Sequence, residues 1–386
     1  MRRFLFNLHL CLALGAGIFI LVMGITGAIM AFEPELDRMF HRKVSYVTPQ
    51  GSRLTLAELG DAVHRAYPRR PIMGYAFPPQ PNLAWAVALQ QRSIFINPYN
   101  GEILGERPFE PDFLGYVHQT HLRLAIRSQS DPGKKIMSWA GMLVLILLLS
   151  GLYLWWPLKR VSIRGSKVTR RFWFDLHNSV GIFSFLFLLL LTLTGVVIGF
   201  EDSTVPLLYR LTGSSPTPRP ALTPMPPNGA LPIGPDRAVE IARTAIPGAE
   251  PFQINVPGPR GAYIVRSRFP EDRTPGGRST VVVEQYTGRV IFAEGSRTAP
   301  AGARMVIANR AIHTGDLFGI PTKTVMSVAS LALVAQVLTG GVMWWKRRRA
   351  TRRQPAGSAT PSRLESSAAA PQTEIPARPP LQAPPG

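Results

Sequence analysis

The stretch Arg171–Phe200, RFWFDLHNSVGIFSFLFLLLLTLTGVVIGF, decides how this chain folds. After its first residues it is an apolar run long enough to cross a bilayer as a helix, with His177 about two turns inside its basic edge. An unpaired imidazole in lipid is costly, so a histidine here indicates a function. The first stretch, NLHLCLALGAGIFILVMGITGAIMAF, repeats the plan, because the same 17 residues separate His9 from Thr26 and His177 from Thr194. We therefore predict an internal tandem duplication.

Four apolar runs have the length of a membrane-spanning helix. We predict such helices over residues 1–33, 136–157, 172–200 and 313–345, the last with a preceding surface segment. The formal net charge of +20 would suggest a nucleic-acid partner in a soluble protein. Here the basic residues gather before the first run, in the connection 158–171 and after the last run. By the positive-inside rule these segments are cytoplasmic, so we expect a multi-pass protein of a bacterial inner membrane with both termini inside and no nucleic-acid partner.

The first apolar run has an alternative reading as a cleaved signal peptide, because it follows basic residues and contains small residues near 28–31. This run is longer than the apolar region of a signal peptide, and it shares its histidine interval with an internal run. Both features favour a retained helix. The single cysteine, Cys11, lies in this run, so no disulfide framework is expected.

Two external segments read as small α+β units. In the unit 34–112 the patterns predict a helix over 54–67 and paired strands over 83–96, and in the unit 236–312 they predict a helix over 236–246 and strands over 263–268 and 280–285. The remaining segments are expected to be an amphipathic surface helix over 113–135, a Pro-rich linker over 201–235 and a disordered cytoplasmic tail over 346–386.

Together these features resemble the PepSY-associated transmembrane helix family. The resemblance covers roughly residues 1–349. It is carried by the two histidine intervals, by Tyr-x-Gly-x-Ile/Val turns at 99–103 and 286–290, by His121 and His313, and by Gly-x3-Trp-Trp endings at 151–156 and 340–345. It implies four membrane-spanning helices with two periplasmic PepSY-like units. Members that resemble this chain include inner-membrane siderophore-iron reductases, which hold two b-type haems.

The histidines themselves suggest haem ligands. A b-type haem needs only axial ligands and packing, and the chain has no Cys-x-x-Cys-His for covalent attachment. We predict an inner haem held by His9 and His177 and an outer haem held by His121 and His313, roughly 20–25 Å apart by helical rise. His118 lies three residues before His121, on the same helical face, and remains an alternative outer ligand. The leucine after His121 and the family position favour His121.

Two functions remain open. The first is a dihaem electron-transfer protein that reduces periplasmic ferric complexes such as ferric siderophores, with a cytoplasmic flavoprotein or quinol as donor, because the chain has no nicotinamide or flavin motif. The second is a non-enzymatic membrane module that binds or regulates a periplasmic partner such as a peptidase. A single buried histidine can also serve only in helix packing, and its repetition is what favours the first function.

Overall fold

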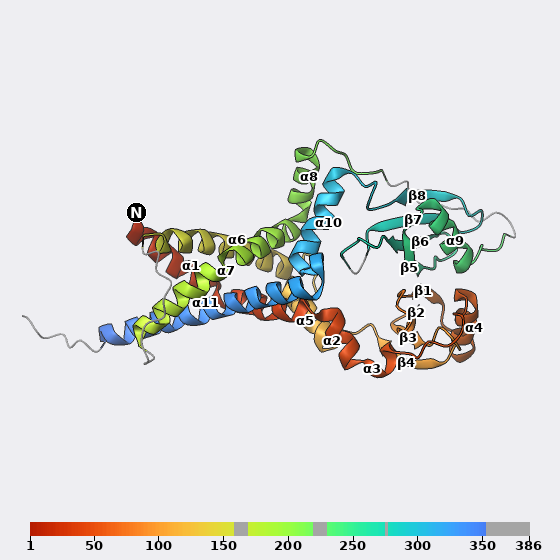
Figure 1. Ribbon diagram of the computed structural model, residues 1–386, viewed down its shortest axis with the longest axis horizontal. Coiled ribbons are helices and arrows are strands. Elements are labelled where there is room, and N and C mark those ends of the chain that lie inside the picture. Colours follow the sequence, from red (N-terminus) through yellow and green to blue (C-terminus); the bar gives the residue numbers. More distant parts are fainter. Residues whose placement is uncertain (158–168, 219–229, 275–276, 353–386) are drawn as a thin grey trace, which may run out of the picture. The chain divides into compact units, whose positions relative to one another are not determined.

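The computed structural model describes residues 1–157, 169–218, 230–274 and 277–352. Most of the predicted basic connection and most of the predicted tail lie outside the described residues. Within them, four helices are long and apolar enough to cross a membrane. They are α1 (Arg2–Met30), α6 (Pro132–Trp155), α7 (Arg170–Gly199) and α11 (Ile320–Arg352), shown in Figure 1. The predicted class of membrane protein is confirmed.

The ends of these helices follow from local capping. The Asp131 side chain accepts a hydrogen bond from the Lys134 amide at the start of α6, and Thr169 does the same for Phe172 at the start of α7. Helix α1 ends at Met30, and Pro34 lies in the first turn of the short helix α2 (Glu33–Phe40), which is followed by α3 (Arg42–Ser45).

The long helices pack through small residues. In the contacts of the described part of the chain, α6 and α11 each lie between α1 and α7. At Gly24 of α1, an added Cβ would come within 2.9 Å of the Ser330 carbonyl oxygen of α11, so only glycine permits this approach. Ala16, Ile20 and Val144 form the buried centre of the bundle.

All eight described strands form one antiparallel sheet in the order β4-β3-β2-β1-β5-β6-β7-β8 (Figure 1). The strands are β1 (Ile72–Ala76), β2 (Trp85–Leu89), β3 (Arg92–Ile96), β4 (Ile103–Pro108), β5 (Glu250–Asn255), β6 (Ala262–Arg268), β7 (Ser279–Glu284) and β8 (Val290–Glu294). The two predicted α+β units share this sheet, because β1 pairs with β5 across them. Gly74 makes this pairing possible, since a Cβ there would lie 2.6 Å from the Ile254 carbonyl oxygen.

The two units also share one hydrophobic core. Helices α4 (Leu56–Ala66) and α9 (Pro235–Ala245) both pack on the sheet, and their apolar residues belong to the same buried cluster as those of the strands. The Asp236 carboxylate of α9 accepts hydrogen bonds from the amides of Leu56 and Ala57 at 2.8 and 2.9 Å, and so caps α4 in the other half of the chain. The halves are thus joined by pairing, packing and capping.

Shorter helices connect the sheet to the bundle and correct three predicted boundaries. They are α5 (Phe113–Arg123), α8 (Glu201–Leu211), α10 (Ala301–Thr314) and the 3-10 turn η1 (Asp316–Phe318). The linker 201–235 begins with helix α8, even though Pro206 lies within it. The segment before the fourth spanning helix is a helix that begins at Ala301, inside the predicted second unit. Residues 346–352, predicted as tail, continue α11, where the Arg349 guanidinium lies 3.8 Å from the Trp345 ring centre.

The described elements follow a similar order in both halves of the chain: a long helix, short helices (three in the first half and two in the second), four strands, a further short helix and a second long helix. The tandem duplication itself stays a prediction.

Candidate functional site

Two histidines from different halves of the chain face each other. His121 lies on α5 and His313 on α10, and their ring centres are 6.5 Å apart with the planes tilted by 48°. Two metal–imidazole bonds of about 2.0–2.1 Å, plus the two half-rings, would place ring centres roughly 6.3 Å apart. The structure therefore brings together the two residues predicted as outer ligands, at the separation that one shared metal requires.

Both imidazoles of this second pair are half-buried, in surroundings that favour the neutral ring. Burial, and then the nearby His313, lowers the pKa of His121 to about 3. Burial likewise lowers the pKa of His313 to about 4. A neutral imidazole has a free lone pair on one ring nitrogen, and this is the form that ligates metals.

The first pair, His9 and His177, lies on the long helices α1 and α7. The two side chains are near enough to interact electrostatically. Thr26 and Thr194 lie 17 residues further along the same two helices, which is about 25 Å at the rise of an α-helix. Since these threonines contact the second pair of histidines, the two pairs are at two separate levels of the bundle.

Each of the four histidines meets a hydroxyl group through its Nδ1 atom. The Nδ1–Oγ distances are 2.8 Å for His9 and Ser150, 2.8 Å for His177 and Thr339, 2.9 Å for His121 and Thr26, and 3.1 Å for His313 and Thr194. Among the described residues, no hydrogen bond engages the Nε2 atom of any of these four rings.

A glycine follows each of these hydroxyl residues in sequence and lies beside the same imidazole. A Cβ added to Gly27 or Gly195 would come within 3.2 or 3.0 Å of the Cε1 atom of the second-pair histidine. At Gly151 and Gly340 the corresponding distances to the first pair are 3.4 and 3.6 Å. The sequence analysis used Thr26 and Thr194 only to mark the repeat, and it did not predict these contacts. The signal that was present is a hydroxyl residue followed by glycine in each of the four long helices.

His118, the alternative outer ligand, has a different partner. Its Nδ1 atom lies 2.8 and 2.9 Å from the two carboxylate oxygens of Glu33 on α2, and its side chain is 37% exposed. It therefore lies at the margin of the second pair, hydrogen-bonded to a carboxylate.

Two lysines near the same level are paired with carboxylates. Lys134 contacts Glu201 at 2.6 Å. Lys323, only 7% exposed, contacts Glu35 at 2.8 Å and the buried Asp316 at 3.4 Å. These contacts tie the ends of the long helices together.

A further cluster of possible metal ligands consists of Asp37, His41 and Asp112. The Arg107 guanidinium lies 2.9 Å from Asp37 and 2.8 Å from Asp112, so a positive charge already occupies the space between the carboxylates. We interpret this cluster as an ion-pair network that joins α2 to β4 and the start of α5.

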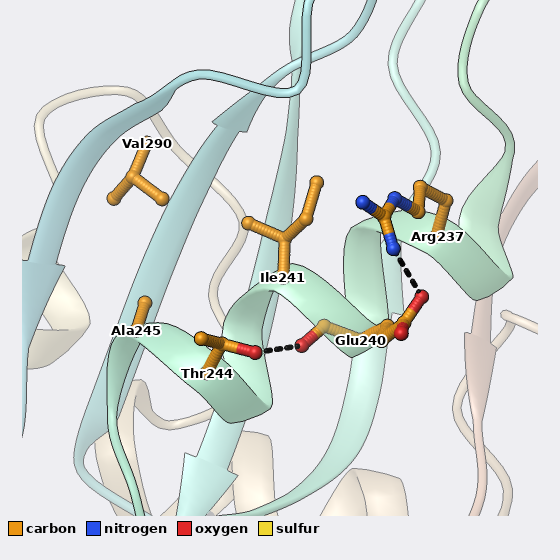
Figure 2. A pocket seen from close by; sticks show the side chains of 6 residues that line it. All are labelled: Arg237, Glu240, Ile241, Thr244, Ala245 and Val290. Carbon is orange, nitrogen blue, oxygen red and sulfur yellow. Dashed lines mark hydrogen bonds and ion pairs between the residues drawn. The ribbon is translucent and has the colours of Figure 1, made fainter.

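A shallow depression of about 250 Å³ lies on α9 beside Val290 of β8 (Figure 2). Two of its charged side chains, Arg237 and Glu240, are paired with each other at 2.6 Å, and the Thr244 hydroxyl donates to the Glu240 carbonyl oxygen at 3.2 Å. The depression contains none of the histidines, and no free polar groups converge in it.

A b-type haem is a group that these residues fit. The four half-buried imidazoles have Nε2 atoms that no described residue engages, and the second pair has the spacing of two axial ligands. Near the first pair, the Nε1 atom of Trp173, one turn before His177, is buried without a partner among the described residues. Such a donor suits an acidic group of a cofactor.

Comparison with known protein families gives one match. The model of the PepSY-associated TM region matches residues 6–347. No curated protein matches the chain.

Proposed function

The chain belongs to the PepSY-associated TM family, and we propose that it is a dihaem b-type electron-transfer protein that reduces ferric complexes, such as ferric siderophores, outside a bacterial inner membrane. The observation that carries this proposal is the arrangement of four half-buried histidines as two pairs at two levels of a helical bundle. Structural histidines in a bundle have no need to pair in this way.

In this proposal His9 and His177 hold the inner haem, and His121 and His313 hold the outer one. Each haem supplies a carrier for a single electron, with a potential set by its ligands and surroundings. The chain itself fixes the imidazole rings, excludes water through the apolar bundle and keeps the two sites at a constant separation.

The direction of transfer follows from the charge distribution. Basic residues flank α1, α7 and α11 at the level of the first pair, so this end would face the cytoplasm and receive electrons from a flavoprotein or quinol. The sheet would lie in the periplasm, beside the second pair.

Positive charge near the second pair suits an anionic acceptor. Arg310 lies on α10, one turn before His313, and interacts electrostatically with it. Burial, and then the neighbouring Arg310 and Arg266, lowers the pKa of Arg278, whose Nε atom is buried without a partner among the described residues. Ferric complexes with oxygen chelators fit such a surface, and one electron converts Fe(III) to Fe(II), which binds hard oxygen ligands less strongly.

The first test is a visible spectrum of the purified protein, oxidised and dithionite-reduced, with a haem count by the pyridine haemochrome method. We expect about two b-type haems per chain, with the low-spin spectrum of two histidine ligands. His9→Ala and His313→Ala should each remove one haem. The reduced protein should then be reoxidised by a ferric hydroxamate complex.

A colourless protein obtained from cells supplied with haem would refute this function. The same result would favour a non-enzymatic module, in which the sheet binds a periplasmic protein and the helices serve as an anchor. In that case His9→Ala and His313→Ala should leave the partner bound.

A further inference from the structure

The four hydroxyl groups that meet the histidines share a second hydrogen bond. The hydroxyls of Thr26, Thr194 and Thr339 donate to the carbonyl oxygen four residues earlier in their own helix, at 2.6, 2.7 and 2.7 Å. The Ser150 hydroxyl donates to the Leu147 carbonyl oxygen at 3.1 Å. A hydroxyl has a single proton, so in each case its oxygen is left only as an acceptor toward the imidazole.

The protonation of the rings follows from this count. Because each hydroxyl oxygen accepts, the Nδ1 atom that faces it must donate and therefore carries the proton. The Leu191 carbonyl oxygen, 3.1 Å from Nδ1 of His313, requires the same of that ring. A neutral imidazole protonated at Nδ1 has its lone pair on Nε2, the atom that no described residue engages.

We infer that four hydroxyl–glycine pairs act as seats, each holding one histidine with Nδ1 protonated and Nε2 presented to a metal: Ser150-Gly151, Thr339-Gly340, Thr26-Gly27 and Thr194-Gly195. The hydroxyl sets the protonation and direction of the ring. At Gly27 and Gly195 the glycine also leaves room beside Cε1, whereas a Cβ at Gly151 or Gly340 would meet Cε1 at an ordinary contact distance. These are positioning residues, since they act through the histidines. Their role with haem rests on the proposed function.

Within each half of the chain, this arrangement links the level of the first pair to the level of the second pair. Helix α1 carries a ligand of the first pair, His9, and the seat of the second-pair residue His121. Helix α7 does the same with His177 and the seat of His313. A shift of α1 or α7 along its axis would therefore disturb both levels at once. This linkage explains why the interval from histidine to threonine is the same in both helices.

Ser150 offers the cleanest test, because its hydroxyl is the one hydrogen-bond partner of His9 within the described residues. We would compare Ser150→Ala with Ser150→Thr, which keeps the hydroxyl. Ser184→Ala is the matched control. Ser184 is equally buried, at 8% exposure for both residues, and its hydroxyl donates to a helix carbonyl oxygen but meets no imidazole.

The first measurement uses haem-free protein labelled with nitrogen-15 at histidine. We expect the wild type and Ser184→Ala to show a protonated Nδ1 at His9, and Ser150→Ala to show a mixture in which Nε2 is also protonated. The second measurement is haem titration. Loss of a hydrogen-bond partner of a metal-bound histidine typically weakens affinity 10–100-fold. Ser150→Ala should therefore bind haem 10–100-fold more weakly at one site, and Ser150→Thr should restore the wild-type affinity.

The inference is overturned if His9 in the wild type is protonated at Nε2, or if Ser150→Ala leaves both the nitrogen-15 spectrum and the haem affinity unchanged. A wild type that has Nδ1 protonated but takes up no haem would refute the electron-transfer proposal, while the assignment of the protonated nitrogen would stand. The two failures are therefore distinguishable.

Discussion

Replacement of Gly195 by alanine should weaken binding of the outer haem without unfolding the protein. The new Cβ would lie 3.0 Å from Cε1 of His313, whereas carbon atoms in contact prefer about 3.5–4.0 Å. The ring must retreat by about 0.5 Å. The Nδ1 atom of His313 lies 3.1 Å from both the Thr194 hydroxyl and the Leu191 carbonyl oxygen. A movement of this size away from them would lengthen both distances to about 3.6 Å, which is too long for a hydrogen bond.

The energies explain why affinity should change more than stability. Alanine gains up to about 1 kcal/mol over glycine in a helix, and the lost hydrogen bonds cost about the same. We therefore expect a nearly unchanged thermal midpoint. Haem affinity at one of the two sites should fall about 10–100-fold, because the ligand loses its orienting partner.

Gly340→Ala is the control, because its Cβ would meet Cε1 of His177 at an ordinary distance of 3.6 Å. It should gain helix stability and keep both haems. The assay is haem titration into the haem-free protein, with thermal unfolding in detergent measured in parallel. Wild-type affinity in Gly195→Ala, or an equal loss in Gly340→Ala, would refute the seat geometry.

Three other outcomes follow from the structure. His121→Ala should lower the haem count from about two per chain to about one. His118→Ala should leave the count unchanged, because the His118 ring is paired with a carboxylate. The pyridine haemochrome method measures both counts, and the reverse result would exchange the roles of the two histidines. Lys323→Met leaves two carboxylates without their cation and should cost on the order of 2–4 kcal/mol in unfolding free energy, less than a fully buried pair because one partner is 34% exposed. Lys134→Met, whose pair is more exposed, should cost no more than about 1 kcal/mol, and equal costs in thermal unfolding would contradict this ranking. Burial raises the pKa of Tyr75 to about 12, so as the pH rises the unfolded chain loses this proton before the folded chain does. The free energy of unfolding should therefore fall between about pH 10 and 12. Tyr75→Phe should flatten that part of the pH profile, and an unchanged slope would count against the burial of the phenol.

The sequence alone predicted the features that depend on local pattern. Apolar runs of about 20 residues are hydrophobic enough to specify membrane-spanning helices wherever they occur, and the described part of the chain contains four such helices. The hairpin of β2 and β3 and the helices α4 and α9 also lie where period and turn residues predicted them. The family was visible in the order of weak motifs, and the match over 6–347 confirms it.

The bounds of helices were less predictable where the local composition indicates a loop but contacts with other helices stabilise a helix. A segment rich in proline and charge reads as a linker, yet α8 forms at Glu201–Leu211 because it packs against α10 and α7. Similarly, α10 begins well before His313, since its helix is stabilised by contact with α7.

The sequence determined which histidines lie in or near apolar helices. It also left His118 and His121 as the two candidates for the haem ligand that pairs with His313. Only the tertiary structure decided that His121 faces His313, that Gly74 lets β1 pair with β5, and that hydroxyls from neighbouring helices meet the imidazoles. The physical reason is that hydrophobic runs and turns are encoded by neighbours in sequence. A contact between residues 95 or 141 positions apart, as for His121 with Thr26 or His9 with Ser150, depends on how whole helices pack, which no local pattern specifies.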